Sequence, residues 1–327
     1  MRPTRRSSRR TSPLRSRPRV VAVPFVLATT LASTLFAVSV TPTAAAVRQS
    51  QSRPATGPSA ESAAVRATIP DPTTASLEAT NGPLTTATYT VPRPSGYGSG
   101  TITYPTASGS YPGVVLMPGY QGTQQNLQWL APRLASWGFV VINVGTSTLG
   151  DDPASRGRQI SAAGTQLISF SSTAGNPIYG KANGTLGAAG HSMGGGGVMA
   201  ALRDDSRFRA GVPLAPYYPN QNFSGVTDPA FFMTCQSDPV AHGNTYALPW
   251  YNSMSRAEKL YIEVPGDHLC PMTGYGNKAK QGKWIVSFFS RWLHGDTRFT
   301  PFLCGAAREA DKNSPSLVTR WQDTCPF

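Results

Sequence analysis

The sequence predicts an α/β fold with a mostly parallel central sheet and helices on both faces of that sheet. Short apolar segments that suit buried strands alternate with segments whose apolar residues recur at helical spacing. The 257 residues from Asp71 to Phe327 have the length of one domain of this class. A glycine-rich turn, Gly190-His191-Ser192-Met193-Gly194, joins one predicted strand to one predicted helix.

The first 46 residues are typical of a secretory signal peptide. They contain eight arginines and no acidic residue, and an apolar run extends from Val20 to Val40. Thr43-Ala44-Ala45-Ala46 then offers small residues for cleavage. An N-terminal membrane anchor is the alternative, which Pro24 and five Ser or Thr residues in the run disfavour. We therefore expect a secreted, extracellular protein, with Sec and Tat export both open.

Most of the excess positive charge belongs to this targeting segment. The whole chain has 29 Lys and Arg against 16 Asp and Glu, whereas the chain beyond residue 46 has 21 against 16. No cluster of Lys and Arg remains there, which argues against nucleic acid as a partner. Once the signal peptide is removed, we also expect no stable association with a membrane.

Residues 47–70 are rich in Ala, Ser, Pro and Gln and lack apolar periodicity, so we expect a flexible lead-in. Residues 71–327 are then expected to form the folded, catalytic domain. This domain opens with Thr85–Val91 and Thr101–Tyr104, whose β-rich alternation around a Gly/Ser/Pro turn predicts a hairpin.

From residue 111 onward, predicted strands and helices alternate, so functional residues are expected beyond the carboxyl ends of the strands. The predicted strands are Tyr111–Met117, Phe139–Val144, Gly184–Ala189, Ala210–Pro213, Ala230–Cys235 and Leu260–Val264. The predicted helices contain Leu127, Leu130 and Leu134, with Gly138 as a cap; Ile160, Ala163 and Leu167; Val198–Leu202; and Lys283–Leu293, with Trp284, Phe288 and Trp292 on one face.

The turn around Ser192 has the pattern G-x-S-x-G between a strand and a helix, which is the nucleophile elbow of α/β-hydrolases. A serine on so sharp a turn projects its Oγ above the sheet, and glycine two residues away on either side avoids a collision with neighbouring strands. The N-terminus of the following helix favours negative charge near the serine. A glycine-rich turn with a chance serine is the alternative. The motif predicts an α/β-hydrolase fold with Ser192 as the nucleophile.

A serine nucleophile needs a base that takes its proton and an acid that orients the base. In α/β-hydrolases, the acid and then the histidine follow the serine in the chain. We predict His268 as the base because it follows the predicted strand Leu260–Val264. His191 adjoins the serine and should point away from it, His242 is only four residues from the best acid, and His294 is placed to cap the last helix.

Asp238 is the predicted acid because it lies just after the strand Ala230–Cys235, at its carboxyl end. The other candidates are disfavoured by position. Asp204 and Asp205 lie roughly 18–20 Å along the helix that follows the serine. Asp228 precedes its strand, and Asp267 adjoins the base and cannot easily reach its ring.

Two N–H groups are needed to stabilise the oxyanion of a tetrahedral intermediate. One is the backbone N–H of Met193, directly after the nucleophile. The other should come from the loop after the first buried strand, where Tyr120 is the natural candidate. The Tyr120 ring would also line the acyl site, and we expect Gln121, Val240 and Leu269 to complete the substrate-binding contacts.

The assembled features resemble the actinobacterial cutinases and the related bacterial poly(ethylene terephthalate), or PET, hydrolases. The similarity extends over nearly all of Thr73–Phe327 and includes the Gly-His-Ser-Met-Gly-Gly-Gly-Gly elbow. It implies the same triad and the same oxyanion hole as argued above. It also implies an aromatic clamp residue after Pro216, where many members have Trp and this chain has Tyr217. The other segments that carry the resemblance are Ala75–Glu78, Pro92–Gly98, Pro118–Tyr120, Pro132–Ser136, Gly138–Ile142 and Gly295–Phe299.

Four cysteines in an exported chain imply two disulfides with three possible pairings. Cys235 and Cys270 lie within three residues of the predicted acid and base. If the triad is right, these two loops meet, and Cys235–Cys270 with Cys304–Cys325 is the sensible pairing. The first bridge is similar to the additional active-site disulfide of the mesophilic PET-hydrolase branch. Reactive or metal-binding thiols are the alternative, which the lack of a C-x-x-C motif disfavours.

About sixteen residues separate the strand that ends near Pro213 from the strand that starts at Ala230, too few for a substantial lid domain. An open site suits a substrate chain such as cutin or a synthetic polyester. We therefore predict a serine esterase that acts as a monomer, without cofactor or metal site, on polyesters and short acyl esters. A lipase or feruloyl-type esterase of the same fold and a catalytically silent binding protein are the alternatives.

Overall fold

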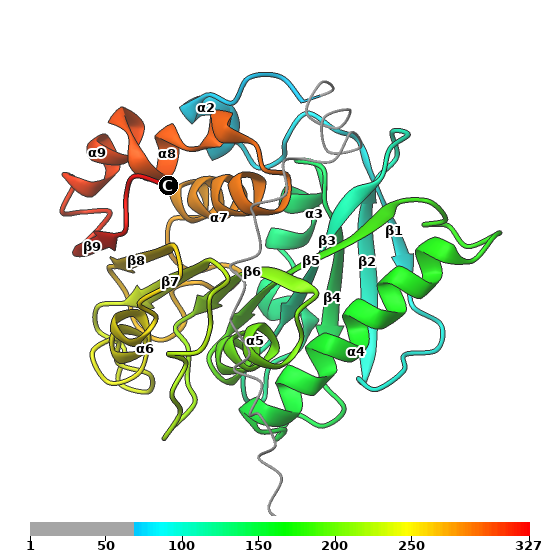
Figure 1. The fold of residues 1–327 in the computed structure, drawn as a ribbon, viewed down its shortest axis with the longest axis horizontal. Helices are drawn as coiled ribbons and strands as arrows, with labels where there is room; N and C mark the ends of the chain where they lie inside the picture. The colour runs from blue at the N-terminus through cyan, green and yellow to red at the C-terminus, as the bar shows by residue number, and fades with distance from the viewer. Residues whose placement is uncertain (1–68) are drawn as a thin grey trace, which may run out of the picture. The chain divides into compact units, whose positions relative to one another are not determined.

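The computed structural model describes residues 69–327, and within them a nine-stranded sheet forms the centre of the fold (Figure 1). The predicted signal peptide, residues 1–46, and nearly all of the predicted lead-in, residues 47–70, lie outside the described residues. The strand order is β1-β2-β4-β3-β5-β6-β7-β8-β9. The strands are β1 (Thr86–Thr90), β2 (Ser99–Pro105), β3 (Tyr111–Met117), β4 (Val140–Gly145), β5 (Ala182–His191), β6 (Phe208–Leu214), β7 (Ala230–Cys235), β8 (Lys259–Val264) and β9 (Arg320–Asp323).

The six strands from β4 to β8 run parallel, and antiparallel pairs occur only towards the two edges of this sheet. The predicted mostly parallel sheet is therefore confirmed. The predicted opening hairpin is the antiparallel pair β1 and β2, in which Tyr89 lies opposite Ile102. Every residue of β3 is buried, as expected for a central parallel strand that is covered on both faces.

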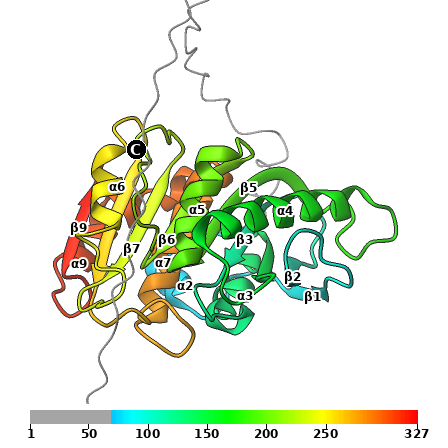
Figure 2. The ribbon, with the colours of Figure 1, turned by 90° about the horizontal axis from the view of Figure 1, so that it is seen from below.

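Helices cover both faces of the sheet, as the sequence predicts. Adjacent residues of β7 point to different helices, since the Phe232 ring contacts Tyr251 of α6 while the Phe231 ring contacts Phe288 of α7. Figures 1 and 2 both show α4 and α5 side by side on the α6 face. The helices of that face are α4 (Pro153–Ser172), α5 (Met193–Asp204) and α6 (Ala247–Ser253), and those of the other face are α3 (Leu130–Ala135) and α7 (Lys278–Leu293).

Two predicted helices have different bounds in the structure. The start predicted for the last helix at Lys283 is wrong, because α7 begins five residues earlier, where the Asn277 side chain accepts the Lys280 N–H at 3.1 Å. The first turn of α7 is polar, so apolar spacing alone could not detect it. The leucine-spaced helix divides into a 3₁₀ turn, η1 (Gln124–Leu127), and α3.

Several short elements have no counterpart in the prediction, because periodicity is not detectable over three to seven residues. The first of them, α2, begins at a capping box in which Thr73 and Ser76 exchange hydrogen bonds. Within residues 69–327, no helix has the length and apolar character required to cross a membrane. The unpredicted elements are α2 (Thr74–Glu78), α6, η2 (Thr297–Phe299), α8 (Pro301–Cys304), α9 (Ala306–Lys312) and β9.

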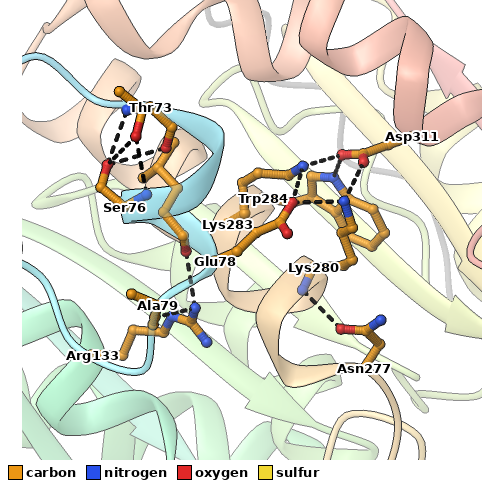
Figure 3. Close-up of polar contacts among 11 residues, drawn as sticks. Thr73, Ser76, Glu78, Ala79, Arg133, Asn277, Lys280, Lys283, Trp284 and Asp311 are labelled. Atoms are coloured by element: carbon orange, nitrogen blue, oxygen red, sulfur yellow. Dashed lines mark hydrogen bonds and ion pairs between the residues drawn. The ribbon is translucent and has the colours of Figure 1, made fainter.

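A partly buried ion cluster joins α2, α7 and α9 (Figure 3). It consists of Glu78, Lys280, Lys283 and Asp311. Lys283 Nζ lies 2.7 Å from both carboxylates, and Lys280 Nζ lies 2.6 Å from Glu78 and 3.0 Å from Asp311. Trp284 Nε1 also donates to Asp311 at 2.8 Å. Each buried charge therefore has an opposite charge or a donor beside it, as burial requires.

Candidate active site

Ser192 lies between the end of β5 and the start of α5, with φ 56° and ψ −121°. A residue other than glycine rarely adopts this conformation, so the surroundings must hold it. The Ser192 N–H donates to the Leu214 carbonyl at 2.9 Å, and the Ser192 carbonyl accepts from Gly196 at 3.0 Å and from Tyr217 at 2.9 Å. The strained turn is thereby fixed by β6, by α5 and by the segment that follows β6.

The two glycines of the G-x-S-x-G motif each have a steric reason. A Cβ on Gly190 would lie 2.5 Å from the Gly194 carbonyl oxygen, and a Cβ on Gly194 would lie 2.3 Å from the Met117 carbonyl oxygen. The predicted collision with a neighbouring strand therefore occurs at Gly194, next to the end of β3, whereas Gly190 faces the elbow helix itself. Without side chains at both positions, α5 can begin directly beside β5 and β3.

The structure brings Ser192, His268 and Asp238 together in one hydrogen-bonded chain. His268 Nε2 lies 2.9 Å from Ser192 Oγ, and His268 Nδ1 lies 2.7 Å from Asp238 Oδ2. The other oxygen, Oδ1, accepts the N–H groups of Val240 and Ala241 at 2.8 and 2.7 Å. Burial raises the pKa of Asp238, but the hydrogen bonds from His268 and the two N–H groups outweigh burial and hold this pKa below its usual value. A charged carboxylate keeps the proton on Nδ1, which leaves Nε2 free to accept one.

The residues set aside as acid or base have other surroundings. Asp267 is exposed, and its carboxylate accepts the Leu269 N–H at 3.0 Å. His242 is exposed as well. His294 is the C-cap residue of α7, where its ring packs against Phe139. His191 is different, because its ring lies against the ring of His268, with 4.6 Å between ring centroids.

The predicted oxyanion-hole residues flank the nucleophile. A Cβ on Gly119 would lie 2.8 Å from Ser192 Cβ, so the backbone just before Tyr120 touches the serine. Gln121 has a φ of 55° and donates its N–H to Leu149 at 3.0 Å, which fixes the far side of this loop. Met193 is the first residue of α5, where backbone N–H groups have no acceptor inside the helix.

Arg156 of α4 holds the same loop, and the sequence reasoning missed it. This side chain is completely buried, and its guanidinium donates to the carbonyl oxygens of Pro118 at 2.9 Å, Leu149 at 3.0 Å and Asp151 at 2.8 Å. A signal was present in the sequence. Arg156 lies four residues before Ile160 and thus on the apolar stripe of the predicted helix, where an unexplained charge indicates a buried role.

Exposed apolar side chains lie on the predicted oxyanion-hole loop and on the loop that carries Asp238. Tyr120 is 59% exposed and Val240 is 53% exposed, although Ser192 itself is 6% exposed. Tyr217 and Leu269 are half-buried, and the Tyr217 ring lies against the Tyr246 ring with 4.9 Å between centroids. Residues 215–229, between β6 and β7, contain neither helix nor strand, in line with the expected lack of a lid domain.

Both disulfides have the expected pairing, Cys235–Cys270 and Cys304–Cys325. The first joins the loop that follows β7 to the loop that follows β8, and these loops carry the predicted acid and base. Among residues 69–327, no group of three or more His, Cys, Asp or Glu side chains is arranged to hold a metal ion.

Comparison with known proteins identifies the family. The profile described as "PETase: PET hydrolase-like" matches residues 59–326 of this chain. The chain belongs to this family. Like other PET hydrolase-like proteins, it is a carboxylic ester hydrolase with an α/β-hydrolase fold.

Curated relatives support the assignment to the PET hydrolase-like family. The chain is 39% identical over 263 residues to Cutinase 1 of Thermobifida cellulosilytica, an alignment that covers 79% of this chain and 97% of the relative. It is also 39% identical over 263 residues to a cutinase of Thermobifida fusca, with 79% and 84% covered. It is 36% identical over 264 residues to a bis(hydroxyethyl) terephthalate hydrolase of Streptomyces coelicolor, with 79% and 81% covered.

Proposed function

We propose that this PET hydrolase-like protein is an exported serine esterase that cleaves polyesters and short acyl esters through an acyl-enzyme intermediate. The observation that carries the proposal is the hydrogen-bond chain from Ser192 Oγ through His268 to Asp238, with distances of 2.9 and 2.7 Å. The names of the relatives, cutinase and bis(hydroxyethyl) terephthalate hydrolase, support ester substrates that are polymeric or have an aromatic acyl group.

In the acylation step, Ser192 Oγ attacks the ester carbonyl carbon and transfers its proton to His268 Nε2. Negative charge moves to the carbonyl oxygen, where the N–H groups of Met193 and Tyr120 stabilise it. The tetrahedral intermediate then collapses, the C–O bond to the alcohol breaks, and the alcohol leaves with the proton from His268. Asp238 stabilises the imidazolium while it exists.

In the deacylation step, a water molecule takes the place of the alcohol. His268 Nε2 removes a proton from this water as its oxygen attacks the acyl carbon. The second tetrahedral intermediate expels Ser192 Oγ, which recovers the proton, and the carboxylic acid is released. Both halves of the reaction use the same base and the same oxyanion hole, and neither requires a cofactor.

The side chains around the triad support a polyester as substrate. Tyr120 and Val240 are exposed apolar side chains on the oxyanion-hole loop and on the loop of the acid. The chain between β6 and β7 contributes no helix that could cover them. Exposed apolar side chains beside a buried nucleophile suit a long ester chain that lies across the surface.

The test is the variant Ser192→Ala, with p-nitrophenyl butyrate as substrate and a fluorophosphonate probe as a label. We expect a loss of several powers of ten in turnover and no labelling, since loss of a triad residue has effects of about this size. Ser224→Ala changes an exposed serine between β6 and β7 and should behave as the wild type. If Ser192→Ala keeps a tenth of the wild-type turnover, the proposal is wrong.

The substrate class is tested by the products released from cutin, PET film and tributyrin under the same conditions. We expect soluble acids from the polyesters as well as from tributyrin. A preference for long-chain p-nitrophenyl esters, with no release from either polymer, would favour the lipase alternative.

We also propose that the protein is exported and that it is a monomer. Residues 1–46 have the composition of a signal peptide, so N-terminal sequencing of the protein from culture medium should begin at Val47. Light scattering coupled to gel filtration should give the mass of a monomer.

A further inference from the structure

His191, the last residue of β5, lies next to the proposed base as well as next to the nucleophile. Its side chain is buried, with a relative exposure of 5%. Its Nε2 lies 2.8 Å from the backbone carbonyl oxygen of His268, and the two imidazole rings pack with 4.6 Å between their centroids. A carbonyl oxygen only accepts hydrogen bonds, so the proton of His191 resides on Nε2 and is donated to His268.

The ring of His191 has little freedom to move. A Cβ built on Gly119 would lie 3.2 Å from His191 Nδ1, so the backbone of the oxyanion-hole loop lies on the side away from Nε2. Burial and, secondly, the neighbouring His268 lower the pKa of His191 to about 4. At neutral pH the ring is therefore uncharged, and it does not oppose the positive charge that His268 acquires during turnover.

His268 needs such a restraint because of where it lies. The three residues before it are exposed, and the loop from Pro265 to Asn277 contains neither helix nor strand. The imidazole nitrogens contact Ser192 and Asp238, but these contacts fix the ring and not the backbone. The Cys235–Cys270 disulfide holds the backbone two residues further on, from the side of β7.

We propose that His191 is a positioning residue whose Nε2–H fixes the backbone of His268 relative to the nucleophile elbow. The inference depends on the triad proposed above. Because His191 precedes Ser192 in the chain, the hydrogen bond connects the loop of the base directly to the turn that carries the nucleophile. Movement of either one is then transmitted to the other, and the distance between Ser192 Oγ and His268 Nε2 is maintained.

The experiment compares His191→Leu, which removes the donor, with His191→Gln, whose amide nitrogen reaches a similar position and can donate to the same carbonyl. We measure kcat and KM with p-nitrophenyl butyrate, and the rate of inactivation by a fluorophosphonate. His191→Leu should lower kcat and the inactivation rate roughly 10- to 100-fold with KM unchanged, as expected when a reacting group shifts by a fraction of an ångström to about 1 Å. His191→Gln should recover most of this loss.

A spectroscopic measurement separates positioning from general destabilisation. The proton shared by His268 Nδ1 and Asp238 should give a low-field NMR signal in the wild type and in His191→Gln, and a broadened or absent signal in His191→Leu. His191→Met is a second variant without a donor, in case the leucine variant does not fold.

The inference is overturned if the donorless variants and His191→Gln lose activity equally, if none of them loses activity, or if KM alone changes. The variant Ser192→Ala distinguishes this failure from failure of the proposed function. If Ser192→Ala is inactive while the His191 variants do not differ, the triad stands and only the role of His191 is rejected. If Ser192→Ala is active, the proposed function is rejected and this inference with it.

Discussion

Asp238 and Asp267 have very different surroundings. Asp238 is buried, and one of its oxygens faces two backbone N–H groups while the other faces His268. Asp267 is exposed and accepts a hydrogen bond only within its own turn in the contacts that the structure shows. The choice of catalytic acid is therefore open to a direct comparison of two variants.

Asp238→Asn should lower kcat by a factor of about 10³–10⁴ while the protein stays folded. The N–H groups of Val240 and Ala241 require the amide oxygen of the new side chain. Its NH₂ group must then face His268 Nδ1, which moves the ring proton to Nε2, where it blocks proton transfer from Ser192. Turnover of p-nitrophenyl butyrate and a thermal melt measure both effects. Asp267→Asn is the matched control and should remain close to the wild type, and a greater loss for it than for Asp238→Asn would contradict the assignment.

Tyr217 is the residue at which substrate preference should change. Its backbone is anchored to Ser192, and its half-buried ring lies against Tyr246, so one face of the ring is held in a fixed direction. A stacked aromatic pair contributes about 0.5–1.5 kcal/mol beyond buried area, so Tyr217→Ala should slow hydrolysis of aromatic polyesters roughly two- to ten-fold. Hydrolysis of p-nitrophenyl butyrate should change by no more than about two- to three-fold, because a short acyl chain offers no aromatic ring to stack.

Tyr217→Trp provides the control for the clamp, because a larger ring at the same position should leave PET hydrolysis unchanged or improve it. Release of terephthalate from PET film and kcat/KM for the small ester are measured in parallel. An equal loss on both substrates in Tyr217→Ala would indicate that the tyrosine only anchors the loop.

Among the elements of secondary structure, α7 is joined to its neighbours by ion pairs. The ion cluster of Glu78, Lys280, Lys283 and Asp311 connects α7 to α2 and α9, and both Lys283 and Asp311 are almost completely buried. Asp311→Asn should lower the free energy of unfolding by about 3 kcal/mol, at the low end for a broken buried pair, because Glu78 still faces Lys283. Urea denaturation at pH 7 measures the change. Glu309→Gln alters an acid of the same helix that is half exposed, and it should cost less than about 1 kcal/mol.

The same cluster predicts how stability depends on pH. Burial raises the pKa values of Glu78 and Asp311, but the hydrogen bonds from Lys280 and Lys283 outweigh burial and hold both pKa values below normal. Stabilisation from a carboxyl group of this kind is fully present above its pKa in the unfolded chain, about 4, and is lost as the pH falls through its folded value. The wild type should therefore lose stability below about pH 4, and Asp311→Asn should lose less over that range. Equal slopes in urea midpoints from pH 5 to pH 3 would contradict this account.

Elements whose buried residues form long apolar patterns are predictable from the sequence, whereas elements defined by their partners are not. The apolar runs of β3 and β4 identified those strands without further information. In contrast, β9 has the sequence Arg-Trp-Gln-Asp and becomes a strand because it pairs with β8, where Trp321 lies opposite Ile262. The polar first turn of α7 was missed for a similar reason, since the Asn277 cap and not apolar spacing defines it.

The three residues of the proposed triad could be chosen from the sequence, and the structure brings them together, because a triad restricts both residue type and chain order. A nucleophile elbow followed by an acid and a histidine at strand ends leaves few choices in a chain with four histidines. Residues that support the site carry no such restriction. His191 contacts a carbonyl 77 residues further along the chain, and no local pattern in the sequence indicates this hydrogen bond.

For the molecule as a whole, the two disulfides should have separable effects. They close loops with sequence separations of 35 and 21 residues, and the loss of each should cost about 3–4 kcal/mol of stability by loop entropy. Replacement of Cys235 and Cys270 by Ala should also lower kcat, because this bridge joins the loops of Asp238 and His268. Replacement of Cys304 and Cys325 should affect stability alone. Peptide mapping without reduction, thermal melts and kcat are the measurements, and a peptide that links Cys235 to Cys304 would contradict the pairing.

The ion cluster also determines when the fold can close during synthesis. The partners of Glu78 on α7 lie 202 and 205 residues further along the chain, and Arg298 reaches back 229 residues to the Ile69 carbonyl. The ribosome makes α2 early, but the lysines that pair with Glu78 are absent until α7 has been made. Such contacts between distant parts of a chain form late and slow the search for the native state. A chain that stops short of α7 therefore leaves Glu78 without its lysine partners, and the nascent protein stays open to chaperones and proteases until α7 is available.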